Sequence, residues 1–534
     1  MNKDVSEWLA NGGSKEKLLE LVARLEGGGD LPVIEMQGGK LHLATDAALA
    51  ALARAGAPFY QRDCKLVRVC RIPLKLSDGS QGQVPAVVEL EAPTVKRTLA
   101  HTVVFKRYDA KQEKLKSIDP PGAVIEQMLS MLGEWPFAPL RGVISTPTIR
   151  HDGSLLLQPG YDEATGLVLF DPPHLPAIPE QPTREDAVDA LALLEGLLDE
   201  FSFETDAGVS KSAALSMLIT PVLRGAMPVA PMHVISKPVA GTGASYLQDL
   251  VAALAIGERC PVVSFSSNGE ENDKRLMDAA ISQQPIIAID NVTSLLMSGF
   301  LCQLIERPVI QPRKLGAGLV TVVNSACVFA NGNNLVIGGS DTVRRTIRIG
   351  LDANMEDPET REFRHDPVAE VMAERGKYIA AILTIARAYC IAGKPDRKSP
   401  LASFSAWSDL VRSPLLWLGR ADALKSMEKL RQEDPVKAHL ANFFHAWMTE
   451  LSLGSGYKTS ELISLAGERK EGDLIRPNLA QAIADIATNK SGHIDPAKLG
   501  LWLRQNVNRI TGGCKLWVDT RDHKRPEWSV SGTM

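Results

Sequence analysis

A glycine-rich turn between an apolar stretch and an amphipathic stretch is the first feature that could do chemistry. Residues 237–250 read KPVAGTGASYLQDL; MHVIS before them is typical of a buried strand, and SYLQDLVAALAIG is typical of a helix. At such a turn, glycines let backbone N–H groups wrap phosphate oxygens, and the helix N-terminus adds partial positive charge. The residues expected to bind a nucleotide's phosphates are Ala240, Gly241, Thr242, Gly243, Ala244 and Ser245.

The turn departs from the usual phosphate loop at two positions. Pro238 occupies the first glycine position, and Ala244 occupies the position of the lysine that reaches the β and γ phosphates. Ser245 keeps the hydroxyl that holds Mg²⁺, whereas Lys237 precedes the loop and is not expected to replace the lysine. Glycine-rich turns between a strand and a helix often bind no ligand. The loop alone therefore fits either a nucleotide site or a simple turn.

Two later apolar stretches end in polar residues that could complete a nucleotide site. PIIAID ends in Asp290, where a carboxylate would orient Mg²⁺-bound water, although a simple strand cap is the alternative. ACVFAN ends in Asn331, where an amide would touch the γ-phosphate or the attacking water. Thirteen residues beyond Asn331, Arg344 and Arg345 could reach a neighbouring subunit's phosphate as arginine fingers, or else lie on a solvated strand edge. The order of all four features favours a nucleotide site.

An alternation of strands and helices must position these groups. PVVSFS, residues 261–266, predicts a second strand, EENDKRLMDAAISQQ a second helix, and PIIAID a third strand, which together indicate a βαβ series with a parallel sheet. We expect an amphipathic helix over 184–204 after a proline-rich linker, and a helical region over 366–430.

The composition limits the class of protein. The chain has 534 residues, 45% hydrophobic and 23% charged, with a net charge of −4, which indicates several folded domains and no global affinity for nucleic acid. The N-terminus lacks an apolar core, and charges break the later apolar stretches, so no membrane association is expected. Seven cysteines without a CxxC pair predict neither disulfides nor zinc. We therefore expect a cytoplasmic protein.

The motifs GTGAS, IIAIDN, VFANGNN and DTVRRTIRI, in this order, resemble the AAA+ superfamily 3 helicase domain of phage and mobile-element (poxvirus-type) primase-helicases. Residues 135–169 and 404–419 resemble the segments that flank it. The resemblance implies a multidomain α/β fold with a P-loop AAA+ ATPase core. The expected domains are 1–30, a helical segment resembling the end of a Toprim primase domain; 31–182, a strand-rich, mixed α+β, collar-like domain; 183–225, a helical connector; 226–352, the ATPase core; 353–432, a helical segment; and 433–534, a winged helix.

The resemblance also implies an activity. Such proteins are ATP-dependent helicases that form rings, often hexamers, and move on single-stranded or forked DNA in a bacterial or phage-infected cell, sometimes with a primase or polymerase. ATP and Mg²⁺ are the implied cofactors, with Ser245 and Asp290 holding the metal. The implied catalytic residues are Asp290, Asn291, Asn331, Arg344 and Arg345.

This chain departs from the family in two ways. Members carry GTGKS where this chain has Ala244, which implies weak hydrolysis and favours a Lys→Ala replacement in an otherwise intact site; the alternative is a catalytically silent scaffold that organises replication or defence partners. Asn291 stands where a catalytic glutamate is usual. Glu270 and Glu271 could polarise water instead, although an acidic pair there is more often a feature of a helix N-terminus.

Two segments are candidates for contact with DNA. Residues 307–324 read as a hairpin whose tip carries Arg313 and Lys314, and such a tip would contact phosphates inside a ring or be merely an exposed turn. Near the C-terminus, Asp495 and Pro496 predict a helix start, and an apolar stripe from Leu499 to Ile510 predicts its buried face. A basic hairpin follows. The expected DNA-binding residues of this region are Lys498, Arg504, Arg509, Lys515, Lys524 and Arg525.

Overall fold

The computed structural model describes residues 31–266, 268–314, 318–489, 491–519 and 526–532. The chain divides into two compact units. The first comprises Met1–Ile72, Pro85–Ile144 and Pro159–Asp171, and the second comprises Pro73–Val84, Ser145–Gln158 and Pro172–Met534. Parts of the expected 31–182 domain therefore belong to the same unit as the expected ATPase core. The helical segment expected over 1–30 lies outside the described residues.

The first unit mixes helices and strands around a large apolar core and a smaller buried cluster of Val67, Leu140 and Val168. In one of its three-stranded sheets, the neighbouring strands β1 and β5 are parallel and β5 and β6 are antiparallel. Three helices cover a core that includes the fully buried Leu52, Leu99 and Val124. The elements are β1 (Val33–Met36), α3 (Leu41–Arg54), β2 (Tyr60–Arg62), β3 (Lys65–Lys75), β4 (Gln81–Glu89), α4 (Ala92–Thr102), β5 (Val104–Asp109), β6 (Lys114–Ile118), α5 (Gly122–Leu129), β7 (Gly142–Ile144), β10 (Gly160–Asp162) and β11 (Leu167–Leu169); the tip of the β3–β4 hairpin belongs to the second unit.

The second unit is built on a parallel five-stranded sheet. Its strands are β12 (Met232–Lys237), β13 (Val262–Ser264), β14 (Ile286–Asp290), β19 (Cys327–Asn333) and β20 (Thr346–Gly350). Their order across the sheet is β13-β14-β19-β12-β20, and every neighbouring pair is parallel. Every residue of β12 and β20 is buried, as expected for strands covered on both faces. The predicted parallel sheet is thus confirmed.

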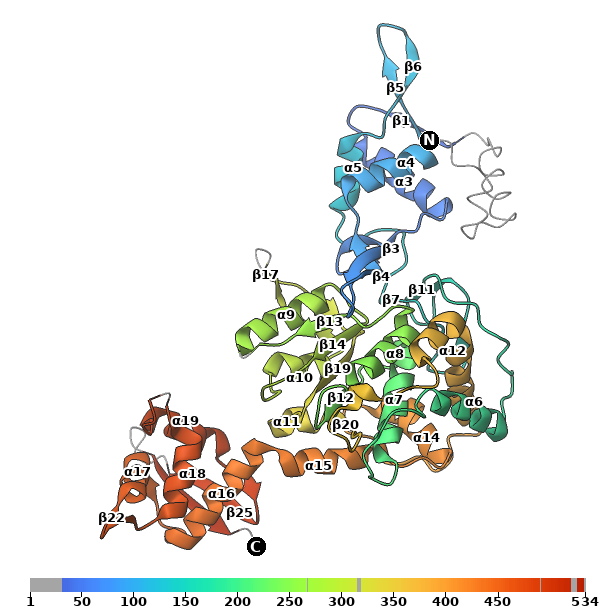
Figure 1. Ribbon diagram of the computed structural model, residues 1–534. Helices are drawn as coiled ribbons and strands as arrows, with labels where there is room; N and C mark the ends of the chain where they lie inside the picture. The colour runs from blue at the N-terminus through green and yellow to red at the C-terminus, as the bar shows by residue number, and fades with distance from the viewer. Residues whose placement is uncertain (1–30, 267, 315–317, 490, 520–525, 533–534) are drawn as a thin grey trace. The chain divides into compact units, whose positions relative to one another are not determined.

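Helices cover both faces of this sheet. Figure 1 shows α7, α8 and α12 on one side of it and α9 and α10 on the other. Their bounds are α7 (Val209–Leu223), α8 (Ala244–Ile256), α9 (Gly269–Ile281), α10 (Gly299–Glu306) and α12 (Pro367–Ile391). The helical region expected over 366–430 continues with α13 (Ser405–Trp407), α14 (Ser413–Trp417) and α15 (Ser426–Glu433).

The helix expected over 184–204 is shorter than predicted. It is α6 (Arg184–Gly196), and its start is fixed by a capping box in which the hydroxyl of Thr183 accepts a hydrogen bond from the backbone of Asp186. The chain leaves the helix after Gly196, and Phe203 then forms a β-bridge with Leu351 at the end of the last strand. The chain therefore leaves the helical path before Phe203, whose long-range bridge periodicity cannot show.

The C-terminal segment has a core of its own, centred on buried aromatic residues such as Phe443, Trp447 and Trp528. Helices α17 to α19 pack against α16 and a small antiparallel sheet of order β21-β26-β25-β24. The elements are α16 (Pro435–Glu450), β21 (Tyr457–Lys458), α17 (Thr459–Gly467), β22 (Arg469–Lys470), β23 (Asp473–Leu474), α18 (Pro477–Ala487), α19 (Pro496–Asn506), β24 (Ile510–Thr511), β25 (Cys514–Asp519) and β26 (Glu527–Gly532). The chain thus ends in a helix followed by a β-hairpin, as the sequence predicts.

One expectation for this segment is wrong. Asp495 does cap α19, accepting from the backbone of Ala497 and Lys498, but the apolar stripe does not extend to Ile510, which is 61% exposed. The helix ends at Asn506 because Val507 is extended and Asn508 adopts a positive φ of 66°. Beyond that point the helical period no longer decides which side chains are buried.

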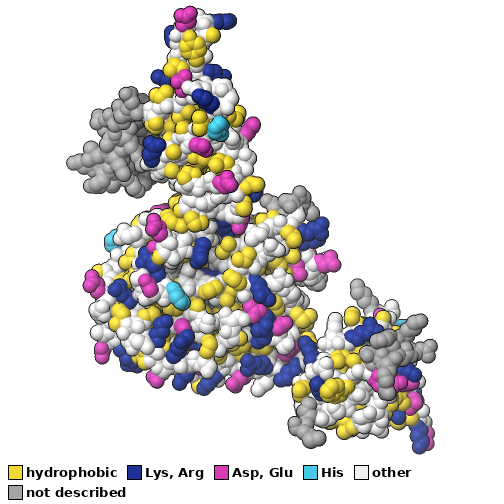
Figure 2. All heavy atoms as spheres, turned by 180° about the vertical axis from the view of Figure 1, so that it is seen from behind, with side chains coloured by type: hydrophobic (Ala, Val, Ile, Leu, Met, Phe, Trp, Pro, Cys, Tyr) yellow, Lys and Arg dark blue, Asp and Glu magenta, His cyan; other side chains and the backbone are white. Residues whose placement is uncertain are grey.

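All seven cysteines are free thiols. Among the described residues, none of the helices combines the length and hydropathy needed to cross a bilayer. On the face shown in Figure 2, positive and negative side chains are interspersed over the surface, consistent with the small net charge of −4.

Candidate nucleotide-binding site

Two glycines of the loop between β12 and α8 have left-handed backbones. Gly241 and Gly243 have φ values of 78° and 98°, which side chains with a Cβ rarely adopt. The hydroxyl of Thr242 donates to the carbonyl of Val239 at 2.7 Å and closes the turn. Gly243 precedes α8 and offers no capping side chain, so no side-chain oxygen competes for the amides of the first helical turn.

Polar groups from two strand ends and one helix meet beside this loop. The Oγ of Ser245 donates to Oδ1 of Asp290 at 3.0 Å, and the Nδ2 of Asn331 donates to the same Oδ1 at 2.6 Å. Asn331 is completely buried and also donates to Gln248 at 2.7 Å, while its own Oδ1 accepts from the backbone of Asn291 at 3.2 Å. The carboxyl ends of parallel strands lie at one edge of a sheet, which is why Asp290 and Asn331, 41 positions apart, are hydrogen-bonded to each other.

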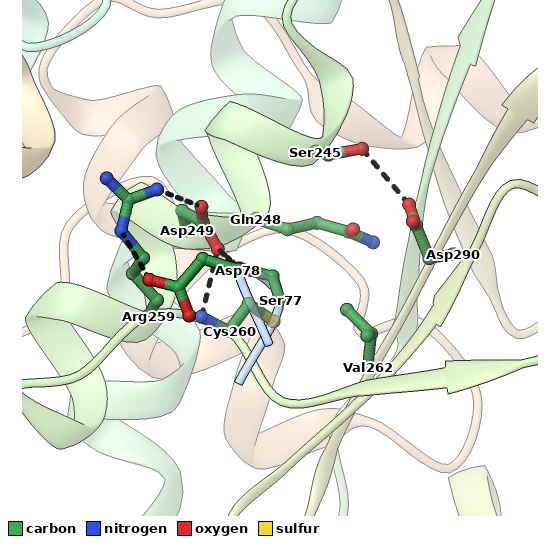
Figure 3. Close-up of a pocket in the computed structure, with 9 residues that line it drawn as sticks. All are labelled: Ser77, Asp78, Ser245, Gln248, Asp249, Arg259, Cys260, Val262 and Asp290. Atoms are coloured by element: carbon green, nitrogen blue, oxygen red, sulfur yellow. Dashed lines mark hydrogen bonds and ion pairs between the residues drawn. The ribbon is translucent and has the colours of Figure 1, made fainter. Parts of the chain in front are cut away.

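A pocket of about 210 Å³ opens at this edge. Figure 3 shows Ser245 and Asp290 pointing toward each other, with Gln248 reaching across from α8. The tip of the β3–β4 hairpin contributes Ser77 and Asp78 to the lining. The other lining residues are Asp249, Arg259, Cys260 and Val262.

Asp249 ties the hairpin tip to the sheet. Its carboxylate accepts from the hydroxyl of Ser77 at 2.8 Å, from the guanidinium of Arg259 at 3.0 Å and from the backbone of Cys260 at 2.9 Å. Burial, with the nearby Asp249 carboxylate, raises the pKa of the Cys260 thiol well above its usual value, so this thiol stays protonated and unreactive. The sequence prediction missed Gln248 and Asp249, although both lie about one helical turn from Ser245 and that spacing could have indicated them.

The two arginines expected to act as fingers differ in their surroundings. The Arg345 side chain is 6% exposed, and its Nε donates to Glu306 at 2.9 Å. The Arg344 side chain is 41% exposed and pairs with Asp341 at 2.9 Å and more loosely with Glu306 at 3.5 Å. Burial would raise the pKa of Glu306, but hydrogen bonds from Ser403 and Arg345 hold it below its usual value. Arg345 is thus held inside its own chain, whereas Arg344 is free to change partners.

The acidic pair at the start of α9 is held as part of a helix N-terminus. The side chain of Asn268 accepts from the backbone of Glu270 at 3.0 Å and of Glu271 at 3.4 Å. The Glu271 carboxylate lies 3.4 Å from Arg275 one turn later. Asn291, at the position where a glutamate was expected, has a left-handed backbone with φ of 50° and is exposed.

The hairpin expected over 307–324 is present. Its lower arms are β15 (Val309–Ile310) and β18 (Val322–Val323), and its upper arms are β16 (Arg313–Lys314) and β17 (Gly318–Leu319), both pairs antiparallel. Arg313 is exposed, and Leu319, its partner in the register, is 70% exposed. A cation and an apolar side chain are therefore both presented to solvent near its end.

Three of the C-terminal candidates have exposed side chains, and Lys515 is partly exposed. Lys498, Arg504 and Arg509 lie on or just after α19, and all three are exposed. The ammonium of Lys515 lies 3.9 Å from the centre of the Trp517 ring, close enough for a cation–π contact. Lys524 and Arg525 lie outside the described residues.

The donor set at the sheet edge suits a hard cation with a phosphate chain. A hydroxyl and a carboxylate 3.0 Å apart are ligands that Mg²⁺ prefers, and the left-handed glycine loop provides a cradle for phosphate oxygens. The first residue of α8 supplies no cation, because it is Ala244, which is 1% exposed and packed into the core.

No protein-family model matches the chain, and no curated protein is found to be similar to it. Several solved structures match at low identity. The apo C-terminal region of NrS-1 is 13% identical, with 82% of this chain and 98% of that chain covered and a TM-score of 0.35. The active helicase Cch of SCCmec type IV is 10% identical over 89% and 98% of the two chains, with a TM-score of 0.35, and a JCV helicase is 14% identical over 47% and 73%, with a TM-score of 0.18. At TM-scores this low, we draw no conclusion from these matches.

Proposed function

We propose that this chain is a nucleoside-triphosphate-dependent DNA helicase of the kind encoded by phages and mobile genetic elements. The observation that carries the proposal is the shared oxygen of Asp290, on which Ser245 and Asn331 converge behind a left-handed glycine loop. This fixed polar network lies at the carboxyl edge of a parallel sheet, the place where α/β proteins bind their ligands.

Different residues of the chain bind different parts of Mg²⁺–ATP. Backbone amides of Gly241 and Gly243 cradle the phosphates, and Ser245 with Asp290 holds Mg²⁺. When bound, the ion neutralises charge on the β and γ phosphates. Asn331 is fixed by its bonds to Asp290 and Gln248, and it orients the carboxylate that holds the ion.

The extent of hydrolysis depends on a cation that the loop lacks. An ammonium on the β and γ phosphates stabilises the transition state by several kcal/mol, so with Ala244 the loop alone binds nucleotide and hydrolyses it weakly. The packed position of Ala244, 1% exposed, favours a second candidate function, a silent AAA+ scaffold that binds nucleotide and DNA to organise replication or defence partners.

The remaining parts of the proposal concern assembly and DNA. Arg344, which is partly exposed, acts across a subunit interface in a ring that we propose to be a hexamer. The hairpin bearing Arg313 and Lys314 contacts the backbone of single-stranded DNA in the channel, and the C-terminal segment binds duplex or forked DNA as a winged helix. The protein acts in the cytoplasm, and a primase or polymerase is a candidate partner.

The proposal is tested by hydrolysis and unwinding. ATP hydrolysis with Mg²⁺ is measured with and without single-stranded DNA, for the chain itself and for Ala244→Lys, and unwinding is measured on forked DNA. We expect DNA to stimulate hydrolysis and Asp290→Asn to abolish it, while Glu163→Gln, an exposed carboxylate of the first unit, changes nothing. Nucleotide binding without DNA-stimulated hydrolysis in either background would favour the scaffold, and absence of nucleotide binding would overturn both.

A further inference from the structure

Lys237 is a largely buried lysine at the end of an inner strand of the sheet. It is the last residue of β12, its register partner is Asn333 of β19, and it is only 9% exposed. The aliphatic stem of this lysine is buried, while its ammonium keeps access to solvent and to a ligand at the sheet edge. Among the described residues, its ammonium is attracted electrostatically by the Asp290 carboxylate. It forms no hydrogen bond and no close ion pair with any of them.

Asp290 attracts this cation, but its hydrogen bonds in the described residues go to other groups. The Oδ1 of Asp290 already accepts from Ser245 and Asn331, and these bonds hold the carboxylate toward α8. Burial lowers the pKa of Lys237, and the charge of Asp290 opposes that shift only in part. A cation in this position gains stability when an anion enters the site beside it.

The position of Lys237 matches what the loop lacks. The usual loop lysine stands on the first helical turn and reaches back over the phosphates, and here that turn begins with the packed Ala244. Lys237 stands at the other end of the loop, seven residues earlier, on the strand from which the loop departs. The helix side of the loop therefore has no cation, because Ala244 stands there. The strand side has one, because Lys237 stands there.

We infer that Lys237 is a phosphate-binding residue that takes the place of the lysine missing at Ala244, reaching the β and γ phosphates from the strand side of the loop. This inference rests on the proposed nucleotide site. It replaces the expectation, drawn from sequence order alone, that a lysine preceding the loop cannot serve it. It also changes the expected activity, because a chain with this cation in place hydrolyses ATP without any change at residue 244.

Nucleotide affinity tests this role independently of turnover. Binding of ATP, ADP and AMP to the full chain is measured by calorimetry with Mg²⁺, for the chain itself and for Lys237→Met, which keeps the apolar stem and removes the charge. Because a charge-assisted hydrogen bond contributes roughly 1.5–3 kcal/mol, we expect ATP binding to weaken by about 10- to 100-fold. AMP, which lacks the β and γ phosphates, should bind with unchanged affinity.

Two further variants serve as control and rescue. Lys211→Met removes a partly exposed lysine that pairs with Asp199 at 3.2 Å, and it should leave ATP affinity unchanged. Ala244→Lys added to Lys237→Met should restore at least about tenfold of the affinity, because the charge returns from the helix side. The unfolding midpoint of each variant is measured to show that it folds.

The outcomes separate the two proposals. If the chain itself binds no nucleotide, the proposed function fails whatever Lys237 does. If the chain binds ATP and a folded Lys237→Met binds it equally well, the function stands and this inference is overturned. If Lys237→Met does not fold, Lys237→Gln is used instead; failure of both to fold would also count against the inference, since a residue kept for a ligand is not needed for folding.

Discussion

The edge of the parallel sheet and the C-terminal segment both carry candidate functional residues, but they hold them in opposite ways. At the sheet edge, Asn331 is completely buried, and both polar atoms of its side chain bond to other residues of the site. On α19, Lys498 and Arg504 are exposed, and the ammonium of Lys498 donates to a backbone carbonyl. One region is preorganised by tertiary contacts, and the other is an electrostatic surface.

This difference indicates what each region can recognise. A rigid network with fixed directions can distinguish one phosphate oxygen from another, because the site needs no reorganisation during binding. Exposed lysines and arginines attract any phosphate backbone, with affinity that depends on salt. We therefore expect substitutions at the sheet edge to act on hydrolysis, and substitutions in the C-terminal segment to act on DNA affinity.

The largest expected effects are at Arg344 and Arg345. Arg345 is buried against Glu306, whereas Arg344 is partly exposed. In the Ala244→Lys background, Arg344→Ala should reduce DNA-stimulated hydrolysis by about 1,000-fold, the lower range for a catalytic arginine, and should change the free energy of unfolding by less than about 0.5 kcal/mol. Arg345→Ala should lower that free energy by about 3 kcal/mol, because Glu306 loses its buried partner. Hydrolysis and chemical denaturation measure the two effects.

Mixed rings check where Arg344 acts. Mixing an Ala244→Lys, Arg344→Ala chain with a Lys237→Met chain that keeps Ala244 and Arg344 should recover part of the hydrolysis, since the first supplies the loop cation and the second supplies Arg344. No recovery at any ratio, with mixed assemblies confirmed by size, would place Arg344 outside the site.

A second test removes one member of the buried network. Asn331→Leu keeps the approximate volume of the side chain and removes its amide, so Ser245 and Asp290 lose their shared partner. We expect hydrolysis in the Ala244→Lys background to fall by about 100-fold, as for loss of one preorganised donor, with DNA affinity unchanged. Equal losses of hydrolysis and DNA affinity would show that the two regions are not separable.

A third test addresses the C-terminal surface. Replacing Lys498, Arg504 and Arg509 together by Ala should lower the slope of log affinity against log salt by about three, one for each phosphate that is no longer neutralised. Basal hydrolysis should stay the same. Lys398→Ala, an exposed lysine in the loop after α12, is the matched control and should leave the slope as it is. An unchanged slope in the triple variant would move DNA binding away from α19.

The smallest expected effect is at the hairpin. Arg313→Ala should reduce the salt slope for single-stranded DNA by about one, because a single exposed cation is removed. If the hairpin contacts DNA in the proposed ring's channel, DNA stimulation of hydrolysis should fall more than affinity does. Full stimulation and unwinding by this variant would make the hairpin an ordinary exposed turn.

Local chemistry made several elements predictable from the amino-acid sequence. The strands around 232–236, 285–290 and 326–331 were predicted because continuous apolar runs of that length suit strands buried on both faces. The start of α19 at Asp495 and Pro496 was predicted because capping depends on adjacent residues only. The hairpin over 307–324 followed from two β-rich arms around a glycine-containing turn. Neighbouring residues along the chain therefore dictate which elements form and where most of them begin.

Which polar side chains bond to one another, and which are buried, depends instead on long-range packing. The contact of Ser77 with Asp249 joins residues 172 positions apart, and the bond of Asn331 to Gln248 joins residues 83 apart. The same holds for the burial of Arg345 beside the exposure of Arg344, and for the buried Lys237 at the start of the loop. Burial and partnership depend on which strands become neighbours, and that order follows from packing the whole chain, since no local pattern encodes it.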